Sequence, residues 1–197
     1  ELLQGMRIKG NEKGAAVATS CPESGPYTDL EMAALLDWAN SAAVRLEISL
    51  VDYAYFLLLA MTARRTVQLA ALRGKDLRGD PQEGSSLFLS VPRVKQRNVR
   101  FRGQFRSLPT IEDLFLILNV VHRRAIETLQ DAIGLSLDDD LKKEVPIFIN
   151  GDVAANVRTL EELRDLLMGS RPDALHATTD SLDSALRRCA RANTARS

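Results

Sequence analysis

The sequence predicts a mainly helical α+β domain with one small antiparallel β-sheet. Two observations predict it. Apolar residues recur at helical spacing over most of the chain beyond residue 27, and a short region between residues 87 and 108 is instead rich in strand formers. The chain has 197 residues, 45% of them hydrophobic and 26% charged, which is the composition of one ordinary globular domain. A chain of this length can bury enough surface to hold its core without disulfides or bound metal.

Residues 1–27 show no helical or strand period and contain several glycines and prolines. We therefore interpret them as a flexible linker or lead-in, and residues 28–197 as the domain. Thr28 and Glu31 have the spacing of a capping box, which predicts that the first helix begins at Thr28.

The next segment, Ser49 to Thr62, is apolar nearly all round and predicts a helix buried inside the domain. A short helix is expected over Arg65–Arg73, ending at Gly74. After the strand region, Thr110 is expected to cap a long amphipathic helix that runs to about Ala132 and stops near Gly134. Toward the C-terminus the pattern predicts a charged loop at 138–143, a short apolar segment at 145–149, a turn at Asn150-Gly151, and helices at about 159–168 and 179–192.

The strand region predicts a two- or three-stranded antiparallel ribbon. Leu87 to Val91 is rich in strand formers, and Asn98 to Leu108 alternates apolar and basic residues. The apolar residues of this segment are Val99, Phe101 and Phe105, and the basic residues that alternate with them are Arg100, Arg102 and Arg106. One apolar and one basic face are therefore expected.

Charge is distributed unevenly along the chain. The totals balance, with 26 basic and 26 acidic residues, which excludes a uniformly basic protein. Six basic residues and no acids lie between Arg93 and Arg106, however, leaving 20 basic against 26 acidic residues elsewhere. Such a basic ribbon is suited to contact a phosphate backbone. The alternative is an edge hairpin that charge protects from aggregation.

No membrane segment, metal site or cofactor is expected. The longest apolar run, Tyr53 to Met61, is far shorter than a membrane span, and no signal sequence opens the chain. Asp138 to Asp140 lacks the spaced ligands and glycine of a calcium loop. Cys21 and Cys189 are interpreted as free thiols in a reducing compartment, which favours a cytoplasmic location.

Three segments together resemble the catalytic domain of the tyrosine recombinases, the phage-integrase family. In that family an apolar helix is followed by Thr-Gly-x-Arg-x-x-Glu and then Leu-x-x-Leu-Arg-x-x-Asp. Here Leu57–Leu77 follows the pattern, with Arg65 at the first catalytic arginine. Leu69, Leu72, Arg73 and Asp76 also match. Ala63 replaces the family's glycine, and Gln68 replaces its acid.

The second segment is the basic ribbon. The family's catalytic lysine lies in a hairpin turn after this helix, and Lys95 is the only lysine between Lys75 and Lys142. The ending Arg106-Ser107-Leu108-Pro109 resembles the family's Arg-x-Val-Pro. The third segment, Asp180 to Ala192, looks like the helix that precedes the second catalytic cluster.

The resemblance implies DNA integration or site-specific recombination through a phosphotyrosyl intermediate, with double-stranded DNA as the partner and no metal or cofactor. Arg65 would stabilise the charge on the attacked phosphate, and Lys95 would protonate the leaving 5′-oxygen. The full-length protein would self-associate on DNA. The backbone of the DNA would be held by Arg93, Arg97, Arg100, Arg102 and Arg106.

The family's His-x-x-Arg pair and its tyrosine nucleophile have no match. The tyrosines are Tyr27, Tyr53 and Tyr55, all before Arg65. The expectation is therefore the N-terminal part of an integrase-like catalytic domain that does not cleave DNA by itself. The alternatives are a non-catalytic DNA-binding protein that uses the same ribbon, and an interaction module without a nucleic-acid role.

Overall fold

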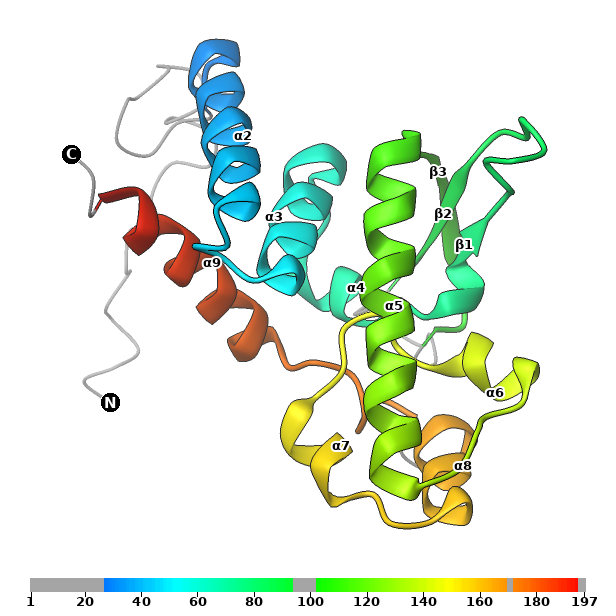
Figure 1. The fold of residues 1–197 in the computed structure, drawn as a ribbon. Coiled ribbons are helices and arrows are strands. Elements are labelled where there is room, and N and C mark those ends of the chain that lie inside the picture. The colour runs from blue at the N-terminus through cyan, green and yellow to red at the C-terminus, as the bar shows by residue number, and fades with distance from the viewer. Residues whose placement is uncertain (1–26, 94–101, 170–171, 195–197) are drawn as a thin grey trace, which may run out of the picture. The chain divides into compact units, whose positions relative to one another are not determined.

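The computed structural model describes residues 27–93, 102–169 and 172–194, without the side chains of 189–194. The described chain is mainly helical with a three-stranded antiparallel sheet, which confirms the predicted fold class (Figure 1). By its internal contacts the chain divides into two compact units, residues 1–39 and 40–197. The predicted linker, apart from Tyr27, and both cysteine side chains lie outside the described residues.

The first described helix, α2, spans Asp29–Val44 and begins as predicted. The backbone N–H of Thr28 donates to Glu31 Oε2 at 2.8 Å, and the N–H of Glu31 donates to Thr28 Oγ1 at 3.3 Å. This reciprocal pair confirms the predicted capping box.

Helix α3, Leu50–Thr62, begins where Ser49 Oγ accepts the N–H of Asp52 at 3.0 Å. It is only partly buried, in contrast to the prediction: Tyr55 and Leu58 are fully enclosed, but Val51 and Met61 are exposed. The helix ends at Ala63, whose φ of 48° lies in the left-handed region. A Cβ makes that conformation unfavourable, which is why glycine usually occupies such a position.

Helix α4, Thr66–Ala70, is shorter than the predicted Arg65–Arg73. The chain leaves the helix because residues beyond it pair with the buried segment 145–148. The N–H of Gly74 donates to Val145 O, and the N–H of Ile147 donates to Leu72 O. Gly74 then opens the 3₁₀ turn η1, Gly74–Asp76.

The sheet contains β1 (Leu77–Arg78), β2 (Phe88–Pro92) and β3 (Phe105–Pro109) in that order. Val91 pairs with Arg106, and Pro92 pairs with Phe105. Paired residues share a face, so Arg106 lies on the face of the buried Val91, and Phe105 lies on the opposite face, 43% exposed. The expected apolar and basic faces are therefore wrong for this part of the ribbon, because Arg106 shares the helix-packed face.

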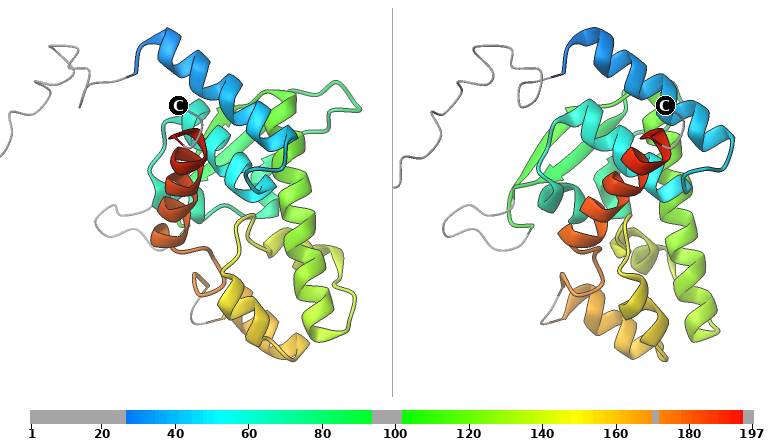
Figure 2. Two further views of the ribbon diagram at one scale, coloured as in Figure 1. Left: turned by 60° about the vertical axis from the view of Figure 1, so that its left-hand side comes forward. Right: turned by 90° about the vertical axis from the view of Figure 1, so that its left-hand side faces the viewer.

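Helix α5, Glu112–Ile133, is capped at Ile111 rather than at Thr110 as predicted, and ends at Gly134, whose φ is 69°. The Thr110 hydroxyl points to Ile111 O instead of to a helical N–H. In Figures 1 and 2 the helix runs from the sheet to the helices α7, Gly151–Asn156, and α8, Leu160–Met168. Its buried residues accordingly divide between two hydrophobic clusters, Leu114 to Val121 in one and Ala125 to Leu129 in the other.

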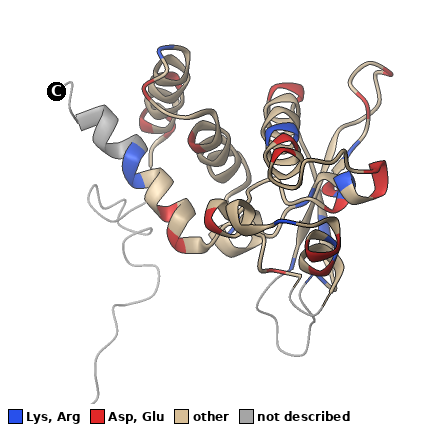
Figure 3. Ribbon diagram, turned by 60° about the horizontal axis from the view of Figure 1, so that its bottom comes forward, with Lys and Arg blue, Asp and Glu red and all other residues tan. Residues whose placement is uncertain are grey.

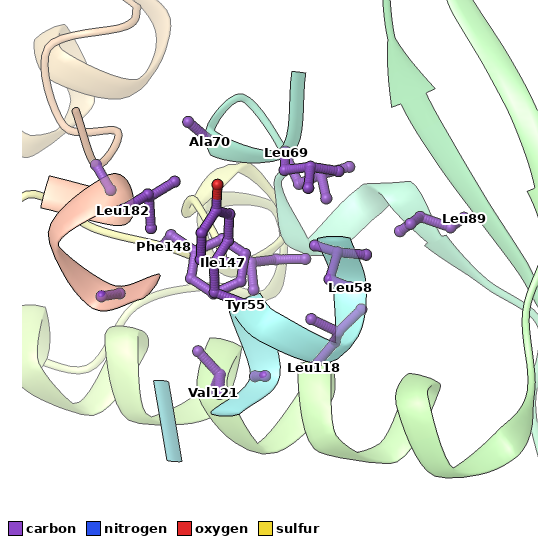
Figure 4. Close-up of a cluster of buried hydrophobic side chains, with 14 of the residues drawn as sticks. Tyr55, Leu58, Leu69, Ala70, Leu89, Leu118, Val121, Ile147, Phe148 and Leu182 are labelled. Atoms are coloured by element: carbon purple, nitrogen blue, oxygen red, sulfur yellow. The ribbon is translucent and has the colours of Figure 1, made fainter. Parts of the chain in front are cut away.

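The first cluster joins α3, α4, α5 and the sheet. At its centre the rings of Tyr55 and Phe148 meet edge to face, with centroids 5.8 Å apart (Figure 4). Leu58, Leu69 and Leu118 surround this pair and are fully buried. The cluster positions α4 against the sheet.

Two helices form where loops or turns were predicted. Asp138 Oδ1 accepts the N–H of Leu141 at 2.8 Å and caps α6, Asp139–Glu144. Asn150 Oδ1 accepts the N–H groups of Asp152 and Val153 and caps α7, Gly151–Asn156. Both errors have one cause, since an Asp or Asn that favours a turn also favours a helix N-cap.

The two remaining helices form as predicted. They are α8, Leu160–Met168, and α9, Thr179–Thr194, which packs on α3 and α4 (Figure 2). Within the described part of the chain, every helix is too short or too polar to cross a lipid bilayer.

Candidate nucleic-acid interface

Arg65 stands at the N-cap of α4, in extended backbone, with its side chain exposed. The residue after it, Thr66, holds this turn in place from two sides. Tyr55 donates its hydroxyl hydrogen to Thr66 Oγ1 at 3.0 Å, and Thr66 donates to Asp183 Oδ1 at 3.3 Å. The Arg65 turn is thereby fixed to α3 and to α9.

One side-chain amide joins the Arg65 turn to the sheet. The N–H of Arg65 donates to Gln68 Oε1 at 3.4 Å, and Gln68 Nε2 donates to Pro92 O at 3.1 Å. Pro92 is the last residue of β2, and the exposed Arg93 follows it. The backbones of Arg65 and Arg93 therefore approach the same amide from opposite sides.

Arg106 adds a third exposed cation beside this junction. It pairs with Val91, one residue before Pro92, on the face of the sheet that packs on the helices. Arg65, Arg93 and Arg106 form no ion pair with any described residue. Elsewhere in the described chain, basic and acidic residues are interspersed (Figure 3). We refer to these three arginines as the open arginine cluster.

Arg102 was predicted to bind DNA with these arginines, but its guanidinium is committed to the protein. It donates to both carboxylate oxygens of Asp76, at 2.7 and 2.8 Å, and also to Ala71 O. Both side chains of the ion pair are nearly completely buried, with 7% and 3% of their surface exposed. The structure therefore does not leave Arg102 open to a phosphate.

Lys95, Arg97 and Arg100 lie outside the described residues. The role of Lys95 as general acid stays a prediction. The contacts of Arg97 and Arg100 with the DNA backbone also stay predictions.

Sequence reasoning missed a buried polar network beneath α4. Arg73 donates to Glu144 Oε2 at 2.6 Å, to Pro172 O at 2.8 Å and to His176 Nε2 at 3.3 Å. His176 Nδ1 lies 2.8 Å from Ala70 O, a pure acceptor, so Nδ1 carries the hydrogen; Nε2 accepts from Arg73, a pure donor, so the ring is neutral. Burial lowers the pKa of His176 to about 3. The only sequence signal was the motif match at Arg73, which indicated the position but not the partners.

Two of the three tyrosines are engaged in the fold. Tyr55 is fully buried, and burial raises the pKa of its hydroxyl above the ordinary value. Burial likewise raises the pKa of Tyr53, whose hydroxyl donates to Asn40 Oδ1 at 3.3 Å. Tyr27 is exposed and belongs to the first unit. A raised pKa is the opposite of what activates a nucleophilic hydroxyl, so neither Tyr53 nor Tyr55 is activated in this way.

No His, Cys, Asp or Glu cluster with the arrangement of a metal site occurs among the described residues. Comparison of the chain with protein-family models, with curated proteins and with solved structures finds no match.

Proposed function

We propose that this chain is part of an enzyme of the tyrosine recombinase type, in which it binds the DNA backbone and supplies an arginine to the phosphate under attack. The observation that carries the proposal is the Gln68 amide between Arg65 and Pro92. It brings the first-arginine position of the motif and the base of the basic ribbon to one place.

The turn at Ala63 supports the alignment of the motif with Arg65. The family pattern has glycine two residues before its arginine, and Ala63 takes a left-handed conformation that favours glycine. Arg64 is the alternative in a shifted alignment. Its side chain is half-buried, with Nε enclosed and without a hydrogen-bond partner among the described residues, whereas Arg65 is exposed.

The chemistry of strand cleavage explains why free arginines are suited to this surface. Attack on a phosphodiester increases the negative charge on the non-bridging oxygens, and a guanidinium stays charged and can contact two oxygens at once. The open arginine cluster has no acidic partner among the described residues that would compete for these contacts. Lys95 would supply the proton for the departing 5′-oxygen.

No tyrosine follows Arg65 in this sequence. We therefore propose that the chain binds duplex DNA without cutting it, and that cleavage needs a tyrosine and a His-x-x-Arg pair supplied by further sequence. In the complete enzyme the protein would act in the cytoplasm and self-associate on DNA.

The experiment is a salt titration of duplex DNA binding with matched double variants. Arg93→Gln/Arg106→Gln removes two open cations, and Arg123→Gln/Arg124→Gln removes two exposed arginines of α5. For the unmodified chain, log affinity falls with log salt concentration. The first variant should reduce that slope by about 2, because each phosphate contact contributes about 0.9. The second should leave it unchanged.

Four outcomes would each contradict a part of the proposal. A slope near zero for the unmodified chain removes the phosphate contacts, and equal slopes for the two double variants remove this surface as their place. A covalent adduct between the 197-residue chain and a nicked suicide duplex would contradict the absence of a nucleophile. If Arg65→Lys left the cleavage rate of the complete protein unchanged, Arg65 would have no catalytic role, even if the chain still bound DNA through this surface.

A further inference from the structure

A pocket of about 630 Å³ opens in the second unit. It lies between η1 and β1, the start of β3, and the ends of α6 and α8. Its volume is in the usual range for small-molecule sites. It is lined by Arg73, Lys75, Asp76, Arg78, Arg102, Phe105, Leu167, Met168, Pro172 and Glu144.

The pocket has more positive than negative groups. Glu144 divides its two oxygens between Arg73, at 2.6 Å, and Lys75, at 2.5 Å. Burial alone would raise the pKa of Glu144, but these hydrogen bonds hold the pKa below its ordinary value. Asp76 is taken by Arg102. Two carboxylates therefore face four cations, counting Arg78, and the surplus favours an anionic ligand.

Two of the cations are accessible to such a ligand. Arg78, at the end of β1, is exposed and has no side-chain hydrogen bond or ion pair with any described residue. Lys75 is 42% exposed, so its pair with Glu144 is weak enough for a doubly charged anion to compete. Arg73 and Arg102 are buried and hold the floor of the pocket in place.

Two of the apolar side chains that line the pocket are accessible. Phe105 is 43% exposed, and Met168 is 60% exposed. The Arg102 guanidinium lies over the Phe105 ring, 5.1 Å from its centroid, which orients the ring. This combination of accessible cations and an aromatic surface can bind a phosphate that carries a flat, apolar group.

We propose that this pocket binds a nucleoside phosphate, with the phosphate on Lys75 and Arg78 and the base against Phe105 and Met168. The site is separate from the proposed DNA surface, because neighbouring residues of a strand point to opposite faces and Phe105 faces away from Arg106. The ligand can be a free nucleotide or a nucleotide within a single strand, since both present the same groups.

The test measures binding of dAMP, inorganic phosphate and a short single-stranded oligonucleotide to the 197-residue chain by titration calorimetry. Arg78→Gln should weaken dAMP and phosphate about tenfold, as loss of one charge-assisted contact does. The matched Arg123→Gln, on the exposed face of α5, should have no effect. Phe105→Leu should reduce dAMP affinity to that of phosphate and leave phosphate unchanged.

The arms distinguish the source of the ligand. Saturable dAMP binding that depends on Arg78 supports a free nucleotide, and Arg78-dependent binding of the oligonucleotide alone supports a strand. Equal affinities of Arg78→Gln and Arg123→Gln for every probe, or no saturable binding, would overturn the proposal. Duplex binding in the Arg93→Gln/Arg106→Gln variant is a separate measurement, so either proposal can fail without the other.

Discussion

Two groups of arginines in this protein differ in their surroundings, although the sequence presents them alike. Arg73 and Arg102 are buried and bonded to Glu144 and Asp76. The open arginine cluster is exposed and without acidic partners among the described residues. Arg102 and Arg106 are four residues apart in one basic run, and only Arg102 is enclosed by its acid.

The role of an arginine in this protein therefore depends on whether a buried carboxylate lies beside it, and not on the residue type alone. A guanidinium enclosed with a carboxylate compensates the charge of that carboxylate, and removal of one leaves the other buried and uncompensated. An exposed guanidinium contributes little to stability and keeps its donors for a ligand. Substitution should therefore lower the free energy of unfolding strongly in the first group and hardly change it in the second.

The largest expected effect is on the free energy of unfolding. Arg102→Gln leaves Asp76 buried without its cation and should lower this free energy by about 3 to 5 kcal/mol. Arg106→Gln, four residues away, should change it by no more than about 0.5 kcal/mol. Urea unfolding followed by circular dichroism measures both. If the two variants were equally stable, the distinction between the two groups would be lost.

The second prediction concerns pH and the buried network. The pKa of His176 is about 3 in the folded protein against an ordinary 6.5, so between these values only the unfolded chain takes up the proton. Stability should be fully present above pH 6.5 and fall as the pH drops toward 3, by about 3 kcal/mol between pH 7 and pH 4 from this group.

The control for this prediction is His176→Gln, which can still donate to Ala70 O and accept from Arg73 but does not titrate. It should flatten the dependence of unfolding free energy on pH over that window, whatever its stability at neutral pH. An imidazole signal of His176 that titrates near pH 6.5 in the folded protein would show that the ring is not held neutral.

The smallest expected effect tests the turn that presents Arg65. Ala63→Gly relieves a left-handed conformation and should raise the free energy of unfolding by about 0.5 to 1 kcal/mol, after the greater freedom of glycine in the unfolded chain is subtracted. Ala60→Gly, inside α3, should lower it by about 1 kcal/mol. Destabilisation by both would mean that the turn at Ala63 is not strained.

Local sequence was sufficient for much of the fold and for part of the candidate site. Some helix boundaries are set by contacts within a few residues of the chain. Examples are the capping pair Thr28 and Glu31, the apolar run of α3 and the glycine after α5. The motif also singled out Arg65, which is exposed at a helix start. Such features depend on neighbours along the chain, so the sequence alone contains the information.

Which basic residues are exposed and which are enclosed depends on contacts between segments that are far apart in the sequence. Asp76 is 26 residues from Arg102, and His176 is 103 residues from Arg73. The alternation in the ribbon did not reveal that Arg106 would share the face of Val91, because strand pairing sets that register. Burial and long-range partners determine whether a charge is neutralised, and no local pattern encodes them.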